Sequence, residues 1–117
     1  MTIKTIVIVG ASRGIGSALV ELMSKDSSNN IIALARNEKS MKERFDSVKN
    51  VSCHAFDLSM NVKEQCASIF QSTDKIDVLI NNAGVLVNKP FTEITSEDFT
   101  TSYQVNVIGV MQTVQEL

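Results

Sequence analysis

Four short apolar runs alternate with longer amphipathic stretches, and this alternation constrains the fold more than any other feature of the chain. The predicted strands cover residues 4–9, 31–35, 51–56 and 76–81. The predicted helices cover residues 14–25, 40–48 and 61–72, and a last stretch from Thr95 to the chain end. This alternation predicts an α/β fold in which a parallel sheet, joined by right-handed crossovers, carries helices on both faces. The strands are apolar nearly throughout, as expected for strands that are covered on both sides.

Apolar residues recur at helical spacing within the predicted helices. One side of the first helix carries Ile15, Leu19, Leu22 and Met23, and the third helix points Val62, Cys66, Ile69 and Phe70 inward. The last helix carries one apolar set at positions 99, 103, 107, 110, 114 and 117, and a second set at 105, 108 and 111. A helix on one face of a sheet needs a single stripe. We therefore expect the last helix to contact two partners.

Composition sets broad limits on the class of protein. The chain has 117 residues, 44% hydrophobic and 21% charged, which is typical of one globular domain over residues 1–117. A net charge of −2 gives no basic surface for nucleic acid or for an anionic membrane. The longest apolar run, residues 6–11, is far shorter than the roughly 20 residues that span a bilayer. We expect a cytoplasmic protein that binds neither nucleic acid nor membrane.

The two cysteines, Cys53 and Cys66, are widely separated in the chain. They suggest neither a disulfide scaffold nor, without a further Cys or His pair, a zinc site. No metal is predicted.

A glycine-rich turn joins the first strand to the first helix. Residues 10–16 read Gly-Ala-Ser-Arg-Gly-Ile-Gly, so the glycines are Gly10, Gly14 and Gly16. Glycines allow a tight turn and a close approach of the backbone to a ligand. The helix that follows directs unpaired N–H groups and its positive dipole end at the turn, which suits a pyrophosphate. The alternative is a turn that merely requires small residues, but its place between a strand and a helix favours a dinucleotide site.

The residue after the second strand distinguishes NAD from NADP. NAD sites usually place an acidic residue there, whereas this chain has Arg36. A guanidinium can bind a 2′-phosphate through paired hydrogen bonds. Arg13 and Ser12 in the glycine turn can reach the same phosphate. Each arginine alone could be a surface side chain, but the pair favours NADP, with NAD as the less favoured alternative.

Four segments together resemble the short-chain dehydrogenase/reductase family. Residues 9–16 are similar to the family's glycine motif, although a threonine is usual where Val9 stands. Asp57-Leu58 follows the third strand, residues 81–84 read Asn-Asn-Ala-Gly, and Asn106 lies in an Asn-Val-Ile-Gly segment. Order and spacing agree with the family over essentially the whole chain. The resemblance implies a three-layer, Rossmann-type, doubly wound parallel sheet with strand order 3-2-1-4.

The resemblance also implies roles for individual residues. The implied cofactor-binding residues are Gly10, Ser12, Arg13, Gly14, Ile15, Gly16, Arg36, Asp57, Leu58, Asn82, Ala83 and Gly84. Asp57 would accept a hydrogen bond from adenine, or alternatively cap the next helix. Asn82 would tie the fourth strand to its neighbours, and Ala83 and Gly84 would leave room for the nicotinamide-side ribose, or else simply form a turn at the strand end. Asn106, the one catalytic residue carried over, would kink its helix and hold a water in a proton relay, or else bond to backbone.

The family's catalytic Ser, Tyr and Lys have no counterpart in this sequence. The family signature is Tyr-x-x-x-Lys, but Val107 stands four residues after Tyr103. Tyr103 and the single histidine, His54, are therefore interpreted as structural. The expectation is the cofactor-binding half of an NADP(H)-dependent oxidoreductase acting on a carbonyl or alcohol, inactive by itself.

Two other functions stay open at the level of sequence. The chain could be a non-catalytic nucleotide-binding or interaction module built on the same scaffold, or, less favoured, a flavodoxin-like domain. In the family the last helix takes part in a subunit interface, and the fourth strand would become a sheet edge here. We therefore expect either a homo-oligomer or a marginally stable chain.

Overall fold

The sheet places the candidate site by bringing the ends of its four parallel strands to one edge. The computed structural model describes residues 2–117, so Met1, the first residue of the predicted 1–117 domain, lies outside it. The strands run in the order β3-β2-β1-β4. Their bounds are β1 (Lys4–Val9), β2 (Asn29–Ala35), β3 (Val51–Ala55) and β4 (Val78–Asn81). This order confirms the predicted Rossmann-type fold and differs from the flavodoxin-like alternative.

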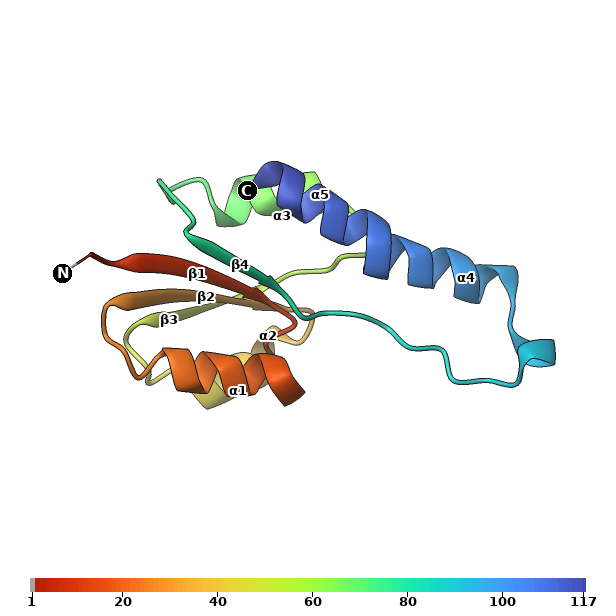
Figure 1. Cartoon of the computed structure of the whole chain (residues 1–117), viewed down its shortest axis with the longest axis horizontal. Helices are drawn as coiled ribbons and strands as arrows, with labels where there is room; N and C mark the ends of the chain where they lie inside the picture. The colour runs from red at the N-terminus through yellow and green to blue at the C-terminus, as the bar shows by residue number, and fades with distance from the viewer. Residues whose placement is uncertain (1) are drawn as a thin grey trace.

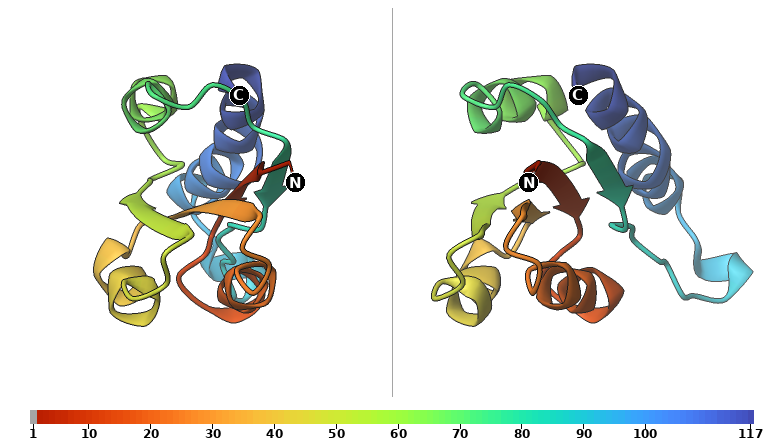
Figure 2. Two further views of the ribbon diagram at one scale, coloured as in Figure 1. Left: turned by 90° about the vertical axis from the view of Figure 1, so that its left-hand side faces the viewer. Right: turned by 60° about the vertical axis from the view of Figure 1, so that its left-hand side comes forward.

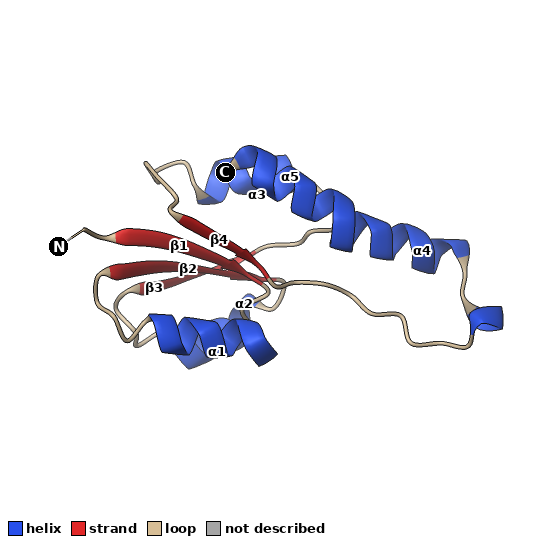
Figure 3. Cartoon of the chain, viewed as in Figure 1, coloured by secondary structure: helices blue, strands red, loops and turns tan. Residues whose placement is uncertain are grey.

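Helices cover both faces of the sheet (Figures 1 and 3). One face carries α1 (Gly14–Met23) and α2 (Glu38–Phe45), and the other carries α3 (Val62–Ile69) and α5 (Gly109–Glu116). Figure 2 shows the sheet between these two helical layers, with α3 beside α5 and α1 beside α2. The predicted three-layer arrangement is therefore present.

Successive residues of the strands supply two separate cores. Ile6 and Ile8 of β1 pack on the side of α1 and α2. Val7 and Val9 pack on the opposite side with Val62 of α3. Such alternation is the normal consequence of a strand whose side chains point to opposite faces. All four of these β1 side chains are at most 2% exposed, so the central strand is covered on both sides as its composition predicted.

The register aligns the carboxyl ends of the strands. Val9 pairs with Leu34 of β2 and with Asn81 of β4. The loops that follow these three strands therefore leave the sheet side by side. Most of the predicted binding residues lie in these loops and in the loop after β3.

Two strands begin at other residues than predicted. β2 starts at Asn29, inside the predicted turn at 26–30, because Asn29 is aligned with Lys4 of β1. β4 starts at Val78 rather than at residue 76. There the Asp77 amide donates to the Thr5 carbonyl at 2.9 Å, while Asp77 Oδ2 accepts a hydrogen bond from the Thr5 amide at 2.8 Å. The Asp77 carboxylate thus accepts a hydrogen bond from the Thr5 amide in place of a backbone carbonyl at the start of β4.

The predicted apolar side of α1 is partly wrong. Val20 is fully buried, whereas Ile15 is 70% and Leu22 is 63% exposed. Both lie about 140–160° round the helix from Val20 at 100° per residue, so they cannot share its face. For α3 the prediction is confirmed, because Val62 and Cys66 are buried and Ile69 and Phe70 pack on the same core.

The last helix is a rod of three consecutive segments. It comprises α4 (Ser96–Tyr103), a π-helical turn η2 (Gln104–Ile108) and α5. A capping box between Thr95 and Asp98 begins α4, and its N-cap Thr95 is the residue at which the last helix was predicted to start. A short 3-10 turn η1 (Phe91–Glu93) lies within the preceding loop.

The rod turns a face with small residues toward the rest of the molecule. The buried positions are Gly109 and Thr113, and Val105 packs against the α3-side core. The longer apolar stripe faces outward, with Phe99 65% and Tyr103 60% exposed. Within residues 2–117 no helix is both long enough and apolar enough to cross a membrane.

Candidate functional site

A cavity of about 530 Å³ lies at the carboxyl edge of the sheet. Most of its lining comes from the segments that follow each of the four strands. Every predicted cofactor-binding residue except Gly16 lines it. The lining also includes residues that were not predicted: Val9, Ala35, Asn37, Ser40, Phe56, Val85 and Val105. The sequence-derived site is therefore one continuous hollow.

The glycine turn is held close against β4 and the start of α1. A Cβ on Gly10 would lie 2.7 Å from the backbone of Ala83, and one on Gly16 would lie 1.9 Å from the carbonyl oxygen of Gly10. Gly10 and Gly16 thus permit backbone contacts that any side chain would prevent. Gly16 is buried beneath the turn, so its contribution to the site is packing rather than contact with a ligand.

Gly14 meets a different requirement. Its φ is +60°, in the left-handed region, and a Cβ there would meet nothing within 4 Å. Gly14 begins α1, and the described residues provide no side-chain cap for this helix and no acidic residue in its first turn. The amino end of α1 therefore presents its N–H groups and positive dipole end to the cavity, an arrangement that favours an anion.

Two arginines extend this positive character. Arg13 and Arg36 both line the cavity and both are exposed. Among residues 2–117 neither forms an ion pair or a side-chain hydrogen bond. Their guanidinium groups are therefore available to a ligand at the rim.

Asp57 lies near Arg36 and forms a local turn. Its Oδ1 accepts hydrogen bonds from the Ser59 hydroxyl at 2.6 Å and the Ser59 amide at 2.8 Å. The Ser59 hydroxyl chiefly lowers the pKa of Asp57, and the charge of Arg36 acts in the same direction. Asp57 does not cap the helix that follows it, because the residue at the N-cap of α3 is Asn61.

Asn82 joins the end of β4 to the glycine turn. Its amide nitrogen Nδ2 donates to the Gly10 carbonyl at 3.3 Å, and its backbone amide donates to the Val9 carbonyl at 3.0 Å. Two loops that line the cavity are thereby connected directly.

Asn106 lies in the π-helical turn and binds the loop after β4. Its Oδ1 accepts from the Val85 amide at 2.8 Å, and its Nδ2 donates to the Val85 carbonyl at 2.9 Å. The side chain is thus bonded to backbone, and a Cβ on Gly84 would approach Oδ1 to 3.1 Å. The arrangement fixes the path of residues 84–85 beside the cavity.

A comparison with known protein families shows which family the chain belongs to. The family model for short chain dehydrogenases matches residues 4–117. The chain belongs to the short-chain dehydrogenase family.

Several named oxidoreductases are similar to this chain. The 3-oxoacyl-(acyl-carrier-protein) reductase FabG of Rickettsia prowazekii is 32% identical over 108 residues, covering 92% of this chain and 44% of the reductase. L-xylulose reductase of Mesocricetus auratus is 31% identical over 109 residues, covering 92% and 43% respectively. An alcohol dehydrogenase of the archaeon Thermococcus sibiricus, solved in complex with 5-hydroxy-NADP, has a TM-score of 0.84 at 29% identity and covers 97% of this chain and 51% of its own. The chain spans about half the length of these relatives.

Other chemically active side chains lie outside the cavity. Tyr103 is on the outward face of the last helix, and His54 lines a separate hollow at the opposite edge of the sheet. His54 is half-buried and forms no hydrogen bond within residues 2–117. Burial raises the pKa of the Cys66 thiol to about 11, which makes it a poor nucleophile. Within the described part of the chain, no group of three or more His, Cys, Asp or Glu is placed to hold a metal.

Sequence reasoning missed Asn37 and Ser40, which line the cavity beside Arg36. The predicted helix began at Ser40, whereas α2 begins at Glu38 with Asn37 as its cap. The signal was present in the sequence, because Asn37 precedes Ser40 by three residues. Asn37 Oδ1 accepts a hydrogen bond from the Ser40 amide at 3.1 Å, which is the usual N-cap geometry.

Proposed function

We propose that this chain is the cofactor-binding part of an NADP(H)-dependent short-chain oxidoreductase that acts on a carbonyl or alcohol substrate. The observation that carries the proposal is the placement of Arg13 and Arg36 on a cavity that also receives the amino end of α1. The complex of the Thermococcus enzyme with 5-hydroxy-NADP supports the same cofactor class.

The residues present fit a dinucleotide. In the proposed arrangement the pyrophosphate lies at Gly14 and Ile15, where the backbone is open and the helix dipole is positive. Arg36 and Arg13 bind the 2′-phosphate, with Ser12 donating a further hydrogen bond. When bound, the nicotinamide would supply or accept the hydride.

The remaining lining residues form the two ends of the proposed site. Asp57 and Leu58 contact the adenine, and Asp57 Oδ1 is held by Ser59 so that the carboxylate keeps one orientation. Ala83 and Gly84 leave room for the second ribose. Asn106 holds Val85 in place and, by the family resemblance, serves in proton relay to a catalytic lysine.

We further propose that residues 1–117 form one NAD(P)-binding domain, that it works in the cytoplasm, and that it does not turn over substrate alone. The sequence contains no Tyr-x-x-x-Lys, so no side-chain pair of that kind can exchange a proton with the substrate. An assay of the purified chain with NADPH and a panel of ketones should show binding of the cofactor without its oxidation.

Replacement of Arg36 by alanine tests the cofactor assignment. We expect Arg36→Ala to weaken NADPH binding by about 10- to 150-fold, the equivalent of about 1.5–3 kcal/mol for a charge-assisted hydrogen bond. NADH lacks the 2′-phosphate, so its affinity should change less than about twofold. Isothermal titration of both nucleotides measures the two affinities.

Lys39→Ala is the matched control, because it removes one positive charge from α2 at an exposed position outside the cavity lining. Its effect on NADPH should be small and should vanish at high salt. Equal or tighter binding of NADH by the unmodified chain would disprove the roles given to Arg36 and Arg13.

A further inference from the structure

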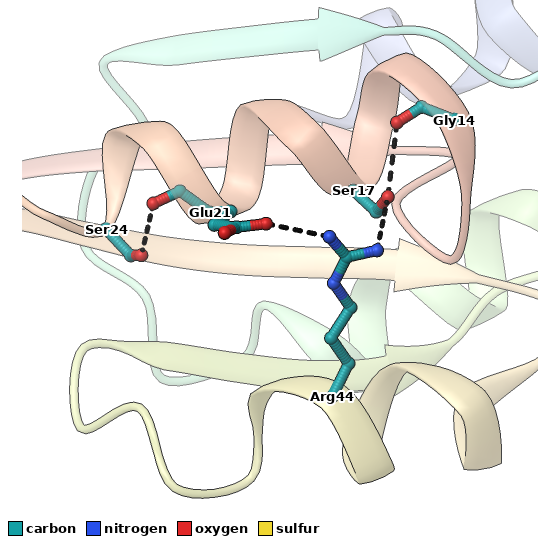
Figure 4. Close-up of polar contacts among 5 residues, drawn as sticks. All are labelled: Gly14, Ser17, Glu21, Ser24 and Arg44. Carbon is teal, nitrogen blue, oxygen red and sulfur yellow. Dashed lines mark hydrogen bonds and ion pairs between the residues drawn. The ribbon is translucent and has the colours of Figure 1, made fainter.

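Arg44 connects the two helices that begin at the cavity (Figure 4). It lies in the last turn of α2 and reaches across to α1. Its Nη1 donates to Ser17 Oγ at 3.0 Å, and its Nη2 donates to Glu21 Oε2 at 2.7 Å. Ser17 Oγ in turn donates to the carbonyl oxygen of Gly14 at 3.1 Å. A continuous chain of hydrogen bonds thus runs from α2 to the first residue of α1.

The contact with Ser17 differs from the contact with Glu21 in its surroundings. Ser17 is only 2% exposed, whereas the side chains of Arg44 and Glu21 are 46% and 60% exposed. Exposed ion pairs contribute little because water and salt screen them. A hydrogen bond from a charged group to a nearly buried hydroxyl is stronger, and its loss leaves a buried polar atom with one partner fewer. We therefore attribute the stable connection between α2 and α1 to the Arg44–Ser17 contact rather than to the Arg44–Glu21 ion pair.

The guanidinium is also held from its own helix. Its Cζ lies 5.4 Å from the centroid of the Phe45 ring, which is within the range of a cation–π contact. Phe45 is 3% exposed and belongs to the core under α1 and α2. Arg44 is thus anchored in the core on one side and bonded to α1 on the other.

The two helices carry the two anion-binding parts of the proposed site. The start of α1, at Gly14 and Ile15, lines the cavity where the pyrophosphate is proposed to lie. Arg36 and Asn37, just before α2, and Ser40, in its first turn, line it where the 2′-phosphate is proposed to lie. A ligand with phosphates at both places requires a fixed distance between the helix starts, whereas a ligand with only the pyrophosphate does not.

We infer that Arg44 is a positioning residue for cofactor choice: through Ser17 it fixes the start of α1 relative to the start of α2, so that both phosphates of NADP are bound at once. The inference rests on the proposed function. The benefit is preorganisation, since a ligand bound at two places gains affinity only when both places are correctly spaced beforehand.

The test compares NADPH and NADH on the full 117-residue chain. Arg44→Met keeps the aliphatic length of the side chain but removes both donors. It should weaken NADPH binding by about three- to tenfold and NADH binding by less than about twofold, since a change of about 1 kcal/mol corresponds to about fivefold. Ser17→Ala removes the same connection from the other side and should give the same pattern. Glu21→Gln, which leaves the Ser17 contact in place, should change neither affinity by more than about twofold.

Hydrogen exchange of the nucleotide-free chain supplies a readout that does not depend on binding. Arg44→Met should increase the exchange of the hydrogen-bonded amides of residues 17–20 in α1 and leave those of α3, on the other face of the sheet, unchanged. A global loss of protection in Arg44→Met would mean that the variant does not fold, and Ser17→Ala then decides.

The outcomes separate this inference from the proposed function. If the unmodified chain binds no NADPH, both fail. If it binds NADPH but Arg44→Met and Ser17→Ala leave the ratio of NADPH to NADH affinity unchanged, only the role of Arg44 is overturned. An equal loss for both nucleotides would likewise overturn it, because a general loosening of α1 does not distinguish one phosphate from two.

Discussion

At the scale of single residues, the three glycines of the turn meet distinct requirements. Gly10 and Gly16 have backbone atoms of other residues where a Cβ would stand, while Gly14 has open space and a left-handed φ of +60°. A motif read from the sequence groups these positions together. The structure assigns Gly16 to packing and Gly14 to conformation and access, whereas Gly10, whose φ is +86°, is required for both packing and conformation.

Alanine substitutions at Gly16 and Gly14 should therefore differ in effect. Gly16→Ala forces a Cβ against the Gly10 carbonyl, and we expect it to cost at least about 3 kcal/mol, the upper end of overpacking penalties. Gly14→Ala meets no atom, so only the left-handed conformation opposes it, at about 1–2 kcal/mol. Urea unfolding of both variants measures the difference. Equal losses would show that the turn rearranges more freely than its close contacts imply.

The residues of the site were largely predictable because they follow strands. Arg36 and Asp57 were found from their places after the second and third strands, and both line the cavity. Gly16 was expected to bind the cofactor but lies beneath the turn, since spacing alone does not distinguish a residue that touches a ligand from one that lets the backbone close. Asn37 was missed because the start of its helix was placed two residues too late.

At the scale of elements, Asp77 joins the start of β4 to β1. Its pKa is lowered first by the Thr5 amide and then by Lys75, whose Nζ lies 3.1 Å from Oδ1. A carboxyl whose pKa is lower in the folded state stabilises that state at pH values above its ordinary pKa of 3.8. The stabilisation is lost as the pH falls through the lowered value.

The pH dependence gives a direct test of this junction. Asp77→Ala should be less stable than the unmodified chain at pH 7, and the difference should shrink as the pH is lowered below about 4. Chemical unfolding at pH 7 and at pH 3 measures both differences. Ala substitution at Asp74, an exposed acid that forms no hydrogen bond within residues 2–117, is the control and should change the stability little. A difference that stays constant with pH would exclude the carboxylate as the cause.

The last helix shows where sequence patterns stop being informative. Its apolar stripe identified a helix with two nonpolar sides, but not which side faces the molecule. The inward side is defined instead by small residues: a Cβ on Gly109 would lie 2.5 Å from the Leu58 carbonyl oxygen, and the buried Thr113 hydroxyl donates to the Gly109 carbonyl at 2.7 Å. Where two backbones approach closely, only small side chains fit between them. A pattern of large apolar residues therefore does not reveal this contact.

At the scale of the whole molecule, the chain is more extended than its length requires. Its radius of gyration is 15.1 Å, against about 13 Å expected for a compact domain of this size. The loop after β4 and α4 project beyond the sheet (Figure 1). The projecting rod carries an exposed apolar stripe, which continues along α5. Its exposed part consists of Phe99, Tyr103, Val107, Val114 and Leu117 together with the adjacent Met111 of the second apolar set, all more than a third exposed.

We expect this stripe to cause self-association, because contiguous exposed apolar surface is uncommon on monomers. Sedimentation velocity at increasing concentration should show dimers or larger species, and Val107→Lys with Met111→Lys should shift them toward monomer. Ile3→Lys, at a 67% exposed position outside the stripe, should leave the association unchanged. A well-folded monomer at high concentration of the unmodified chain would contradict the expectation.

The central strand of the sheet is also the first strand of the chain, and this has a consequence for the order of assembly. Thr5 pairs with Asn30, 25 residues away, whereas Ile6 pairs with Val78, 72 residues away. Closing the longer loop costs about 1 kcal/mol more in chain entropy, and such distant pairings form late. The contacts that Ala83 and Asn82 make with Gly10 and Gly16 arrive with that last strand. During synthesis β1, β2 and β3 would therefore pair before β4 docks, and until then the cavity at the carboxyl edge of the sheet would lack the side that residues 82–85 provide.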